Sequence, residues 1–150
     1  MQERFETFTV LINRISRDIR KIKNQEMADY HLRSAHVSCL YYVYSLGSVT
    51  SAELCEHCEE DKATISRAVD YLETNGFLLR DTGAKRYKSP LLLTEKGREA
   101  GKRIAEKIGS ILETISHALT ENERIEFYRC LSTISRSLEA IVQNSEEKEL

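Results

Sequence analysis

Apolar side chains recur at helical spacing in three segments, one near the start of the chain and two near its end. Successive apolar positions are three or four residues apart, which places them on one side of a helix. They are Phe5, Phe8, Ile12, Ile15, Ile19 and Ile22; Gly97, Gly101, Ile104, Ile108, Ile111 and Ile115; and Phe127, Leu131, Ile134, Leu138 and Ile141. The pattern predicts a long helix over residues 3–24 and two more over 97–144, each with an apolar side that must be covered.

Capping residues mark where the two later helices begin. Thr120 stands three residues before Glu123, the spacing of a capping box, and Thr94 precedes the other helix.

The middle of the chain is too short to cover three long apolar sides. These sides either pack on one another within a monomer or meet a second copy, and we favour a two-fold dimer in which the terminal helices of both copies interlace.

Shorter helices are expected in the middle of the chain. The first spans residues 34–46 and ends before Gly47. Its inward positions are Val37, Leu40, Tyr41 and Tyr44. A second short helix opens at a capping box formed by Thr50 and Glu53, and its small or apolar positions are Ala52, Leu54, Cys55 and Cys58. The sequence therefore predicts two helices before residue 60.

A third helix follows after a tight turn and carries the polar residues of greatest interest. Asp61 is placed to cap it, and Asn75-Gly76 ends it, because both residues tolerate the left-handed conformation of a helix end. Its apolar positions are Ile65, Ala68, Val69 and Leu72. With these facing the core, the outward residues are Thr64, Ser66, Arg67 and Asp70. A helix-turn-helix that presents hydroxyls and an arginine is suited to a DNA major groove.

A basic hairpin is predicted next. Residues 77–79 and 90–93 are short apolar strand candidates, and Pro90 suits the start of a strand because it cannot donate a ladder hydrogen bond. The segment between them contains a glycine and four cations, Arg80, Lys85, Arg86 and Lys88. A two-stranded wing with this charge would reach phosphates or a minor groove.

The distribution of charge agrees with this interpretation. The net charge of the 150 residues is −2, but residues 62–103 carry ten cations and five acids, whereas residues 51–61 carry five acids and no lysine or arginine. Positive charge is therefore concentrated on the third short helix, the hairpin and the start of the next helix. Local potential, rather than total charge, attracts a polyanion.

The motifs of this region, taken together, resemble those of the MarR family of winged-helix transcription regulators. They are Val49-Thr50-Ser51-Ala52-Glu53-Leu54-Cys55, Asp61-Lys62-Ala63-Thr64-Ile65-Ser66-Arg67, Leu72-Glu73-Thr74-Asn75-Gly76-Phe77-Leu78-Leu79-Arg80 and Leu93-Thr94-Glu95-Lys96-Gly97. The resemblance covers roughly residues 33–101. The chain departs from the family pattern at Glu59 and Glu60, in the turn, and in the wing, where Arg86 lies one residue from the usual arginine position.

The resemblance implies a mainly α fold with a small β-wing: one MarR-type domain over residues 1–150. Its winged helix-turn-helix core would span 33–97, flanked by dimerisation helices over 3–24 and 97–144. It also implies a homodimeric regulator, usually a repressor, that binds a pseudo-palindromic operator in double-stranded DNA and often releases it on meeting a small ligand. The expected DNA-binding residues are Lys62, Ala63, Thr64, Ser66, Arg67, Arg80, Lys85, Arg86 and Lys88.

Cysteines and histidines offer alternative functions for the same fold. In the segment Cys55-Glu56-His57-Cys58, the two cysteines have the Cys-x-x-Cys spacing of zinc ligands. A zinc site usually needs a second pair of ligands at a fitting distance, and the sequence offers none, so we expect both cysteines to be buried packing residues. His36 and Tyr41 are the candidates for a ligand pocket. Regulation by a metal or by oxidation of Cys39 or Cys130 is an alternative, as is a protein-interaction module that does not bind DNA.

Other classes of protein are not supported. No segment approaches the 18 or so apolar residues that cross a bilayer, and the N-terminus lacks a secretory apolar core, so we expect a cytoplasmic protein without a membrane partner. The chain contains no glycine-rich phosphate loop, nucleophile elbow or paired-carboxylate motif. We expect neither an enzyme nor a bound cofactor or metal.

Overall fold

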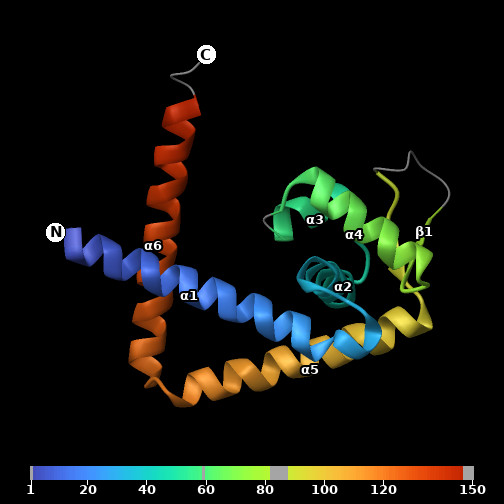
Figure 1. Cartoon of the computed structure of the whole chain (residues 1–150), viewed down its shortest axis with the longest axis horizontal. Helices are drawn as coiled ribbons and strands as arrows, with labels where there is room; N and C mark the ends of the chain where they lie inside the picture. Colours follow the sequence, from blue (N-terminus) through green and yellow to red (C-terminus); the bar gives the residue numbers. More distant parts are fainter. Residues whose placement is uncertain (1, 59, 82–87, 147–150) are drawn as a thin grey trace. The chain divides into compact units, whose positions relative to one another are not determined.

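The computed structural model describes residues 2–58, 60–81 and 88–146, and they form a mainly helical protein with one small sheet (Figure 1). The chain divides into two compact units, Met1–Lys107 and Ile108–Leu150. The first contains α1 (Gln2–Glu26), the 3-10 helix η1 (Ala28–Tyr30), α2 (Ser34–Leu46), α3 (Ser51–Cys58), α4 (Lys62–Thr74), β1 (Leu78–Arg80) and β2 (Leu91–Leu93). Helix α5 (Glu95–His117) runs from the first unit into the second, which also contains α6 (Glu121–Glu146). The predicted mainly α fold with a small β-wing is confirmed.

The core of the first unit forms around α2. This helix contacts α1, α3, α4 and β2, and its residues Cys39, Leu40 and Val43 are completely buried. The apolar side of α4 is buried as the sequence predicted, with Ile65, Ala68, Val69 and Leu72 all inside. Tyr41 and Tyr44, expected to face inward, are only half-buried.

Helix ends follow the local sequence. The capping boxes are present, since Thr50 N donates to Glu53 Oε2 over 2.7 Å and Thr120 N donates to Glu123 Oε2 over 2.8 Å. Gly97 N donates to Thr94 Oγ1 over 2.9 Å at the start of α5. After α2 the chain turns at Gly47, whose φ of 84° is a conformation that side chains other than glycine rarely adopt.

The sheet is an antiparallel pair with Leu78 opposite Leu93 and Arg80 opposite Leu91. Each strand begins one residue later than the sequence predicted, so Phe77 and Pro90 precede the strands instead of opening them. Val49 joins the sheet through an isolated bridge in which Leu91 N donates to the Val49 carbonyl over 2.8 Å. This bridge ties the segment before α3 to the wing.

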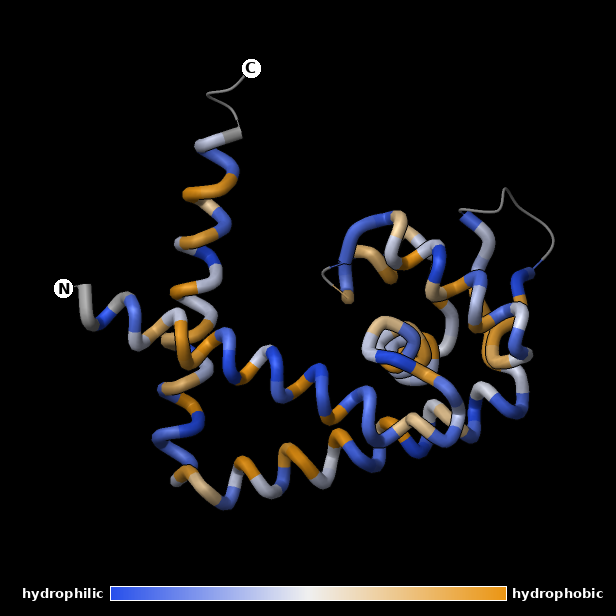
Figure 2. The backbone as a smooth tube through the Cα atoms, viewed as in Figure 1, coloured by the Kyte–Doolittle hydropathy of each residue, from blue (hydrophilic) through white to orange (hydrophobic). Residues whose placement is uncertain are grey.

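Apolar residues recur along the long helices (Figure 2), and many of their side chains are exposed. In the first unit, the side chains of Ile12, Ile15 and Ile19 on α1 are exposed, Ile15 to 51%. In the second unit, Phe127, Ile134, Leu138 and Ile141 on α6 are exposed, Ile141 to 62%. The long helices are those predicted, but much of the apolar surface of α1 and α6 is not covered within the unit to which each belongs. None of the helices in the described part of the chain is sufficiently long and apolar to cross a bilayer.

Gly97 is required where α5 begins to pack on the hairpin. A Cβ atom at this position would overlap the carbonyl oxygen of Phe77 and press on the Leu93 side chain, and the oxygen belongs to backbone that cannot rotate away. Gly109, later in α5, has open space around the same position.

We therefore expect Gly97→Ala to lower the free energy of unfolding by about 1–3 kcal/mol, the usual cost of overpacking. Gly109→Ala is the matched control and should raise stability by roughly 0.5–1 kcal/mol, since alanine is the better helix former. Urea unfolding followed by circular dichroism measures both. Equal effects of the two substitutions would show that the α5–hairpin approach is not tight.

Candidate nucleic-acid interface

Helix α4 presents a polar face whose residues are connected by hydrogen bonds. Asp61 caps the helix, because its Oδ1 accepts from Thr64 N over 2.7 Å, and its Oδ2 accepts from Thr64 Oγ1 over 3.1 Å. Arg67 Nη2 donates in turn to Thr64 Oγ1 over 3.2 Å. Asp61, Thr64 and Arg67 thus form a chain of hydrogen bonds along the first two turns of α4.

Most of the α4 residues that were predicted to bind DNA are exposed to solvent. Lys62, Ala63, Ser66 and Arg67 are exposed, and Thr64 is half-buried. Because Ile65, Val69 and Leu72 fix the opposite side of the helix in the core, these five residues face solvent together. The face therefore combines two cations and two hydroxyls on a rigid element.

The cap also affects the acidity of Asp61. Hydrogen bonds from Thr64, from its backbone amide first and its hydroxyl second, lower the pKa of the Asp61 carboxyl below its usual value, with Arg67 contributing a smaller attraction. Glu53 in α3 has a lowered pKa for the same reason, since Thr50 donates to it through its amide and its hydroxyl. Ionised caps therefore hold the beginning of both helices of the helix-turn-helix.

The wing is less uniformly basic than the sequence suggested. Arg80 forms a half-buried ion pair with Glu73 of α4, with Nε to Oε1 at 2.9 Å and Nη2 to Oε2 at 3.0 Å. Its charge is therefore largely balanced within the protein, and its role as a phosphate contact is weakened. Lys88 is exposed, whereas Lys85 and Arg86 lie outside the described residues.

Lys96, at the start of α5, is a cation that the sequence analysis did not select. Its Nζ donates to the Asn75 carbonyl over 2.9 Å and lies 4.2 Å from the centre of the Phe77 ring. Lys96 therefore connects the start of α5 to the end of α4 and to the residue before β1. The Leu-Thr-Glu-Lys-Gly motif was the sequence signal that could have drawn attention to Lys96. Its contact could not be predicted locally, because the carbonyl that accepts the hydrogen bond lies 21 residues earlier.

Comparisons with known proteins agree with this architecture. The family model described as the MarR family matches residues 32–83, which include α2, α3, α4 and β1. The chain is also similar to the uncharacterized HTH-type transcriptional regulator YwoH of Bacillus subtilis, with 27% identity over 97 residues that cover 65% of this chain and 71% of the relative. Residues 32–83 of the chain are thus similar to the MarR family.

Solved structures share the fold of this chain. NMB1585, a MarR family regulator from Neisseria meningitidis, superposes with a TM-score of 0.81 at 19% identity and covers 95% of this chain and 98% of its own. MepR of S. aureus, in a complex with DNA, superposes with a TM-score of 0.78 at 18% identity, covering 87% of this chain and 97% of its own. The winged helix-turn-helix fold is thereby established over most of the chain.

His36, one of two candidate ligand residues, has a structural role. Its Nδ1 accepts from Arg33 N over 3.0 Å, which caps the start of α2, and its ring stacks on Tyr71 of α4 with centroids 4.3 Å apart. Burial lowers the pKa of His36, so the neutral ring that accepts this hydrogen bond is favoured. The stack connects α2 directly to α4.

Tyr41, the other candidate, is half-buried and meets Tyr42 edge to face with ring centroids 5.3 Å apart. It does not contribute to the His36–Tyr71 stack. The two candidates therefore do not form one site through ring contacts.

The expectation for the Cys-Glu-His-Cys segment needs correction. Cys55 and Cys58 are half-buried, not fully buried, because they lie on the flank of the short helix α3 instead of its core-facing side. His57 stacks on Tyr42 with ring centroids 5.1 Å apart. Among the residues that the structure describes, no group of three or more candidate ligands could hold a metal ion.

Asp61 gives the α4 face a measurable dependence on pH. Because its pKa is lower in the folded than in the unfolded chain, its ionised form stabilises the fold above about pH 4, and this contribution disappears as pH falls through the folded pKa. We expect Asp61→Asn, which keeps a capping oxygen but cannot ionise, to unfold at lower urea than the parent at pH 7. The difference should shrink by pH 3, and a constant difference would contradict the role of the charge.

Proposed function

We propose that this chain is a homodimeric DNA-binding repressor of the MarR type that reads a pseudo-palindromic operator with α4. The supporting observation is the exposed polar face of α4, held in place by the buried stripe of Ile65, Val69 and Leu72 and by the Asp61 cap. Lys62 and Arg67 supply positive charge, while Ser66 and Thr64 supply hydroxyls that can bond base edges.

Lys88 and the residues 85 and 86 of the wing would contact phosphates beside the major-groove site. Such contacts set affinity and register without reading sequence. Because Arg80 is paired with Glu73, we expect it to contribute less to phosphate binding than the sequence suggested. A dimer bound across a promoter occupies DNA that the polymerase needs, and this is the basis on which we propose repression.

The dimer is supported by the exposed apolar side chains of α1 and α6. A row that includes Phe127, Leu138 and Ile141 is unlike the surface of a monomeric soluble protein, where large contiguous apolar patches are rare. A two-fold partner would cover these rows and would place two copies of α4 about one turn of DNA apart, at roughly 34 Å. The occupant we propose is therefore a second copy of this chain.

Release of DNA by a small molecule would act through the contact between α2 and α4. The His36 ring stacks on Tyr71, and the Tyr71 hydroxyl donates to the His31 carbonyl over 3.0 Å. A ligand that separated these rings would move α4, and it would release DNA to the extent that it binds the moved state more tightly. His36 and Tyr41 remain our candidate ligand residues on α2.

DNA recognition is tested by selecting bound sequences from a random duplex pool and measuring affinity for the selected operator. Arg67→Ala should cost on the order of 1–3 kcal/mol on the operator if Arg67 makes a bidentate base contact, and it should change affinity for random DNA little. Lys62→Ala is the matched control and should weaken both by a similar factor, as expected for a phosphate contact. Equal losses on both DNAs for Arg67→Ala would reassign Arg67 to a phosphate, and absence of any binding at low salt would refute the function.

The dimer is tested by placing a charge in the apolar row of α6. Leu138, which is 49% exposed, should tolerate glutamate within one chain but not in a dry interface, where an unpaired charge is costly. We expect Leu138→Glu to shift the protein from dimer to monomer in sedimentation equilibrium at micromolar concentration. Gln143→Glu adds the same charge to the polar side of α6 and should leave the dimer intact; a monomeric parent would refute the proposal.

A further inference from the structure

The single arginine of α4, Arg67, is exposed, and its guanidinium is held by a residue one turn earlier. Its Nη2 donates to Thr64 Oγ1 over 3.2 Å, and Thr64 Oγ1 donates in turn to Asp61 Oδ2 over 3.1 Å. Because the Asp61 carboxylate accepts the hydroxyl proton, the lone pairs of Thr64 Oγ1 are available to Arg67. The helix cap therefore sets the direction of the hydroxyl and, through it, the position of the guanidinium.

The contact with Thr64 positions Arg67 without consuming its capacity to bind a ligand. A hydroxyl is neutral, so it does not balance the charge of the guanidinium. Nη2 carries two N–H groups, and only one of them is needed for the bond to Thr64. The other N–H and the N–H of the adjacent nitrogen form a parallel pair of donors, the geometry that matches O6 and N7 of guanine in the major groove.

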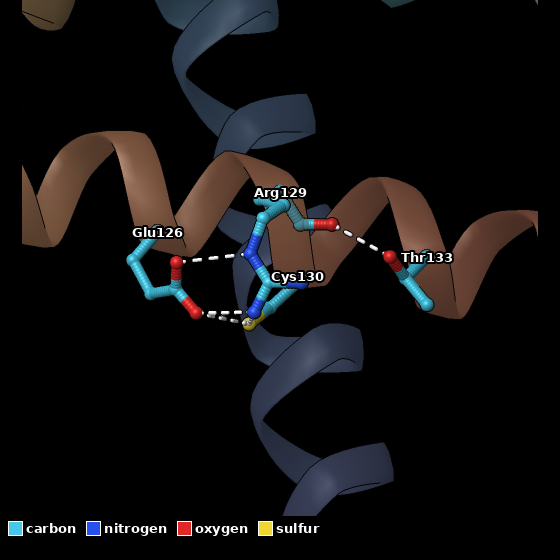
Figure 3. A network of polar contacts seen from close by, with 4 residues as sticks. All are labelled: Glu126, Arg129, Cys130 and Thr133. Carbon is cyan, nitrogen blue, oxygen red and sulfur yellow. Dashed lines mark hydrogen bonds and ion pairs between the residues drawn. The ribbon is translucent and has the colours of Figure 1, made fainter.

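An arginine at the same spacing in α6 provides a contrast. Arg129 follows Glu126 by three residues, as Arg67 follows Thr64. Arg129 Nε donates to Glu126 Oε2 over 2.9 Å, and Arg129 Nη2 donates to Glu126 Oε1, so a carboxylate occupies both donors of one edge (Figure 3). The charge of Arg129 is thereby paired within its own helix. The residue three positions before the arginine thus decides whether the guanidinium is neutralised or only positioned.

We propose that Thr64 and Asp61 are positioning residues that hold the Arg67 guanidinium for one guanine of the operator. The inference rests on the proposed DNA-binding function and assigns Thr64 a specific part in it. The hydroxyl proton of Thr64 is used by Asp61, so Thr64 contributes to recognition through Arg67 instead of donating to a base. An arginine side chain that is already held loses less rotamer freedom on binding, and this lowers the cost of the base contact.

The test measures discrimination at one base pair of the selected operator. This pair is the one at which Arg67→Ala no longer distinguishes guanine from other bases, and discrimination is the ratio of affinities for the operator and for its variant at that pair. Thr64→Val keeps the shape of the side chain but removes the hydroxyl, and it should lower the ratio roughly two- to tenfold, the cost of ordering one side chain. Thr64→Ser keeps the hydroxyl and should preserve the ratio. Thr74→Val makes the same change at the exposed last residue of α4 and should also leave it unchanged.

A double-mutant cycle shows whether Thr64 acts through Arg67. In an Arg67→Ala background, Thr64→Val should cause no further loss of discrimination at any base pair. A remaining loss would show that Thr64 reads a base by itself and would overturn the proposal, as would an unchanged ratio for Thr64→Val alone. Asp61→Asn keeps one oxygen for Thr64 N but cannot accept the hydroxyl proton through its NH₂ group, so it should lower the ratio as well. An unchanged ratio for Asp61→Asn would overturn the role of Asp61.

The positioning of Arg67 is also measurable in the protein without DNA. NMR relaxation of the Arg67 Nε–H group should give a higher order parameter in the parent and in Thr64→Ser than in Thr64→Val, because the hydroxyl restricts motion of the guanidinium. Equal order parameters would overturn the proposal even if the protein binds its operator. Failure of the parent to bind any DNA would instead refute the proposed function, while relaxation would still decide whether Thr64 holds Arg67.

Discussion

The burial of one side of α4 against α2 is the interaction on which the remainder of the site depends. Ile65, Val69 and Leu72 are almost completely inaccessible, and Leu40 and Val43 of α2 are buried with them. The helix backbone sets the direction in which each side chain leaves it. Burying one side of α4 therefore also determines that Thr64, Ser66 and Arg67 point away from the core. The direction of these outward side chains is thus a consequence of packing, because they cannot point elsewhere while the core is intact.

Several short contacts hold α4 at its two ends. The Asp61 cap orders the first turn, whereas Lys96 at the start of α5 closes on the Asn75 carbonyl after the last turn. The Glu73–Arg80 ion pair connects the helix to β1, and the Tyr71 hydroxyl connects it to the His31 carbonyl. The helix is therefore tied to the wing and to the segment between η1 and α2.

One side of α4 is packed closely in the core, whereas the longest helices carry rows of exposed apolar side chains. The described residues therefore present two kinds of surface. The exposed face of α4 is polar and charged, which suits a phosphate-rich partner, whereas the rows on α1 and α6 are apolar and suit a second copy of the chain. Two α4 helices on one dimer would then read two half-sites, so the apolar rows and the polar face belong to one function.

The sequence by itself determined the elements of this protein. Helical periodicity and capping spacing are local signals, and they located α2, α3, α4 and α6 and the residues Thr50, Asp61, Thr94 and Thr120 that begin helices. Only the tertiary structure decided which polar residues remain available, because that depends on partners distant in the chain. The sequence presented Arg80 as one of the cations of the wing, and only the structure places the Glu73 carboxylate of α4 beside it. Met27 and Leu32 also became core residues without any periodic pattern, since their burial depends on how η1 and its flanks fold between α1 and α2.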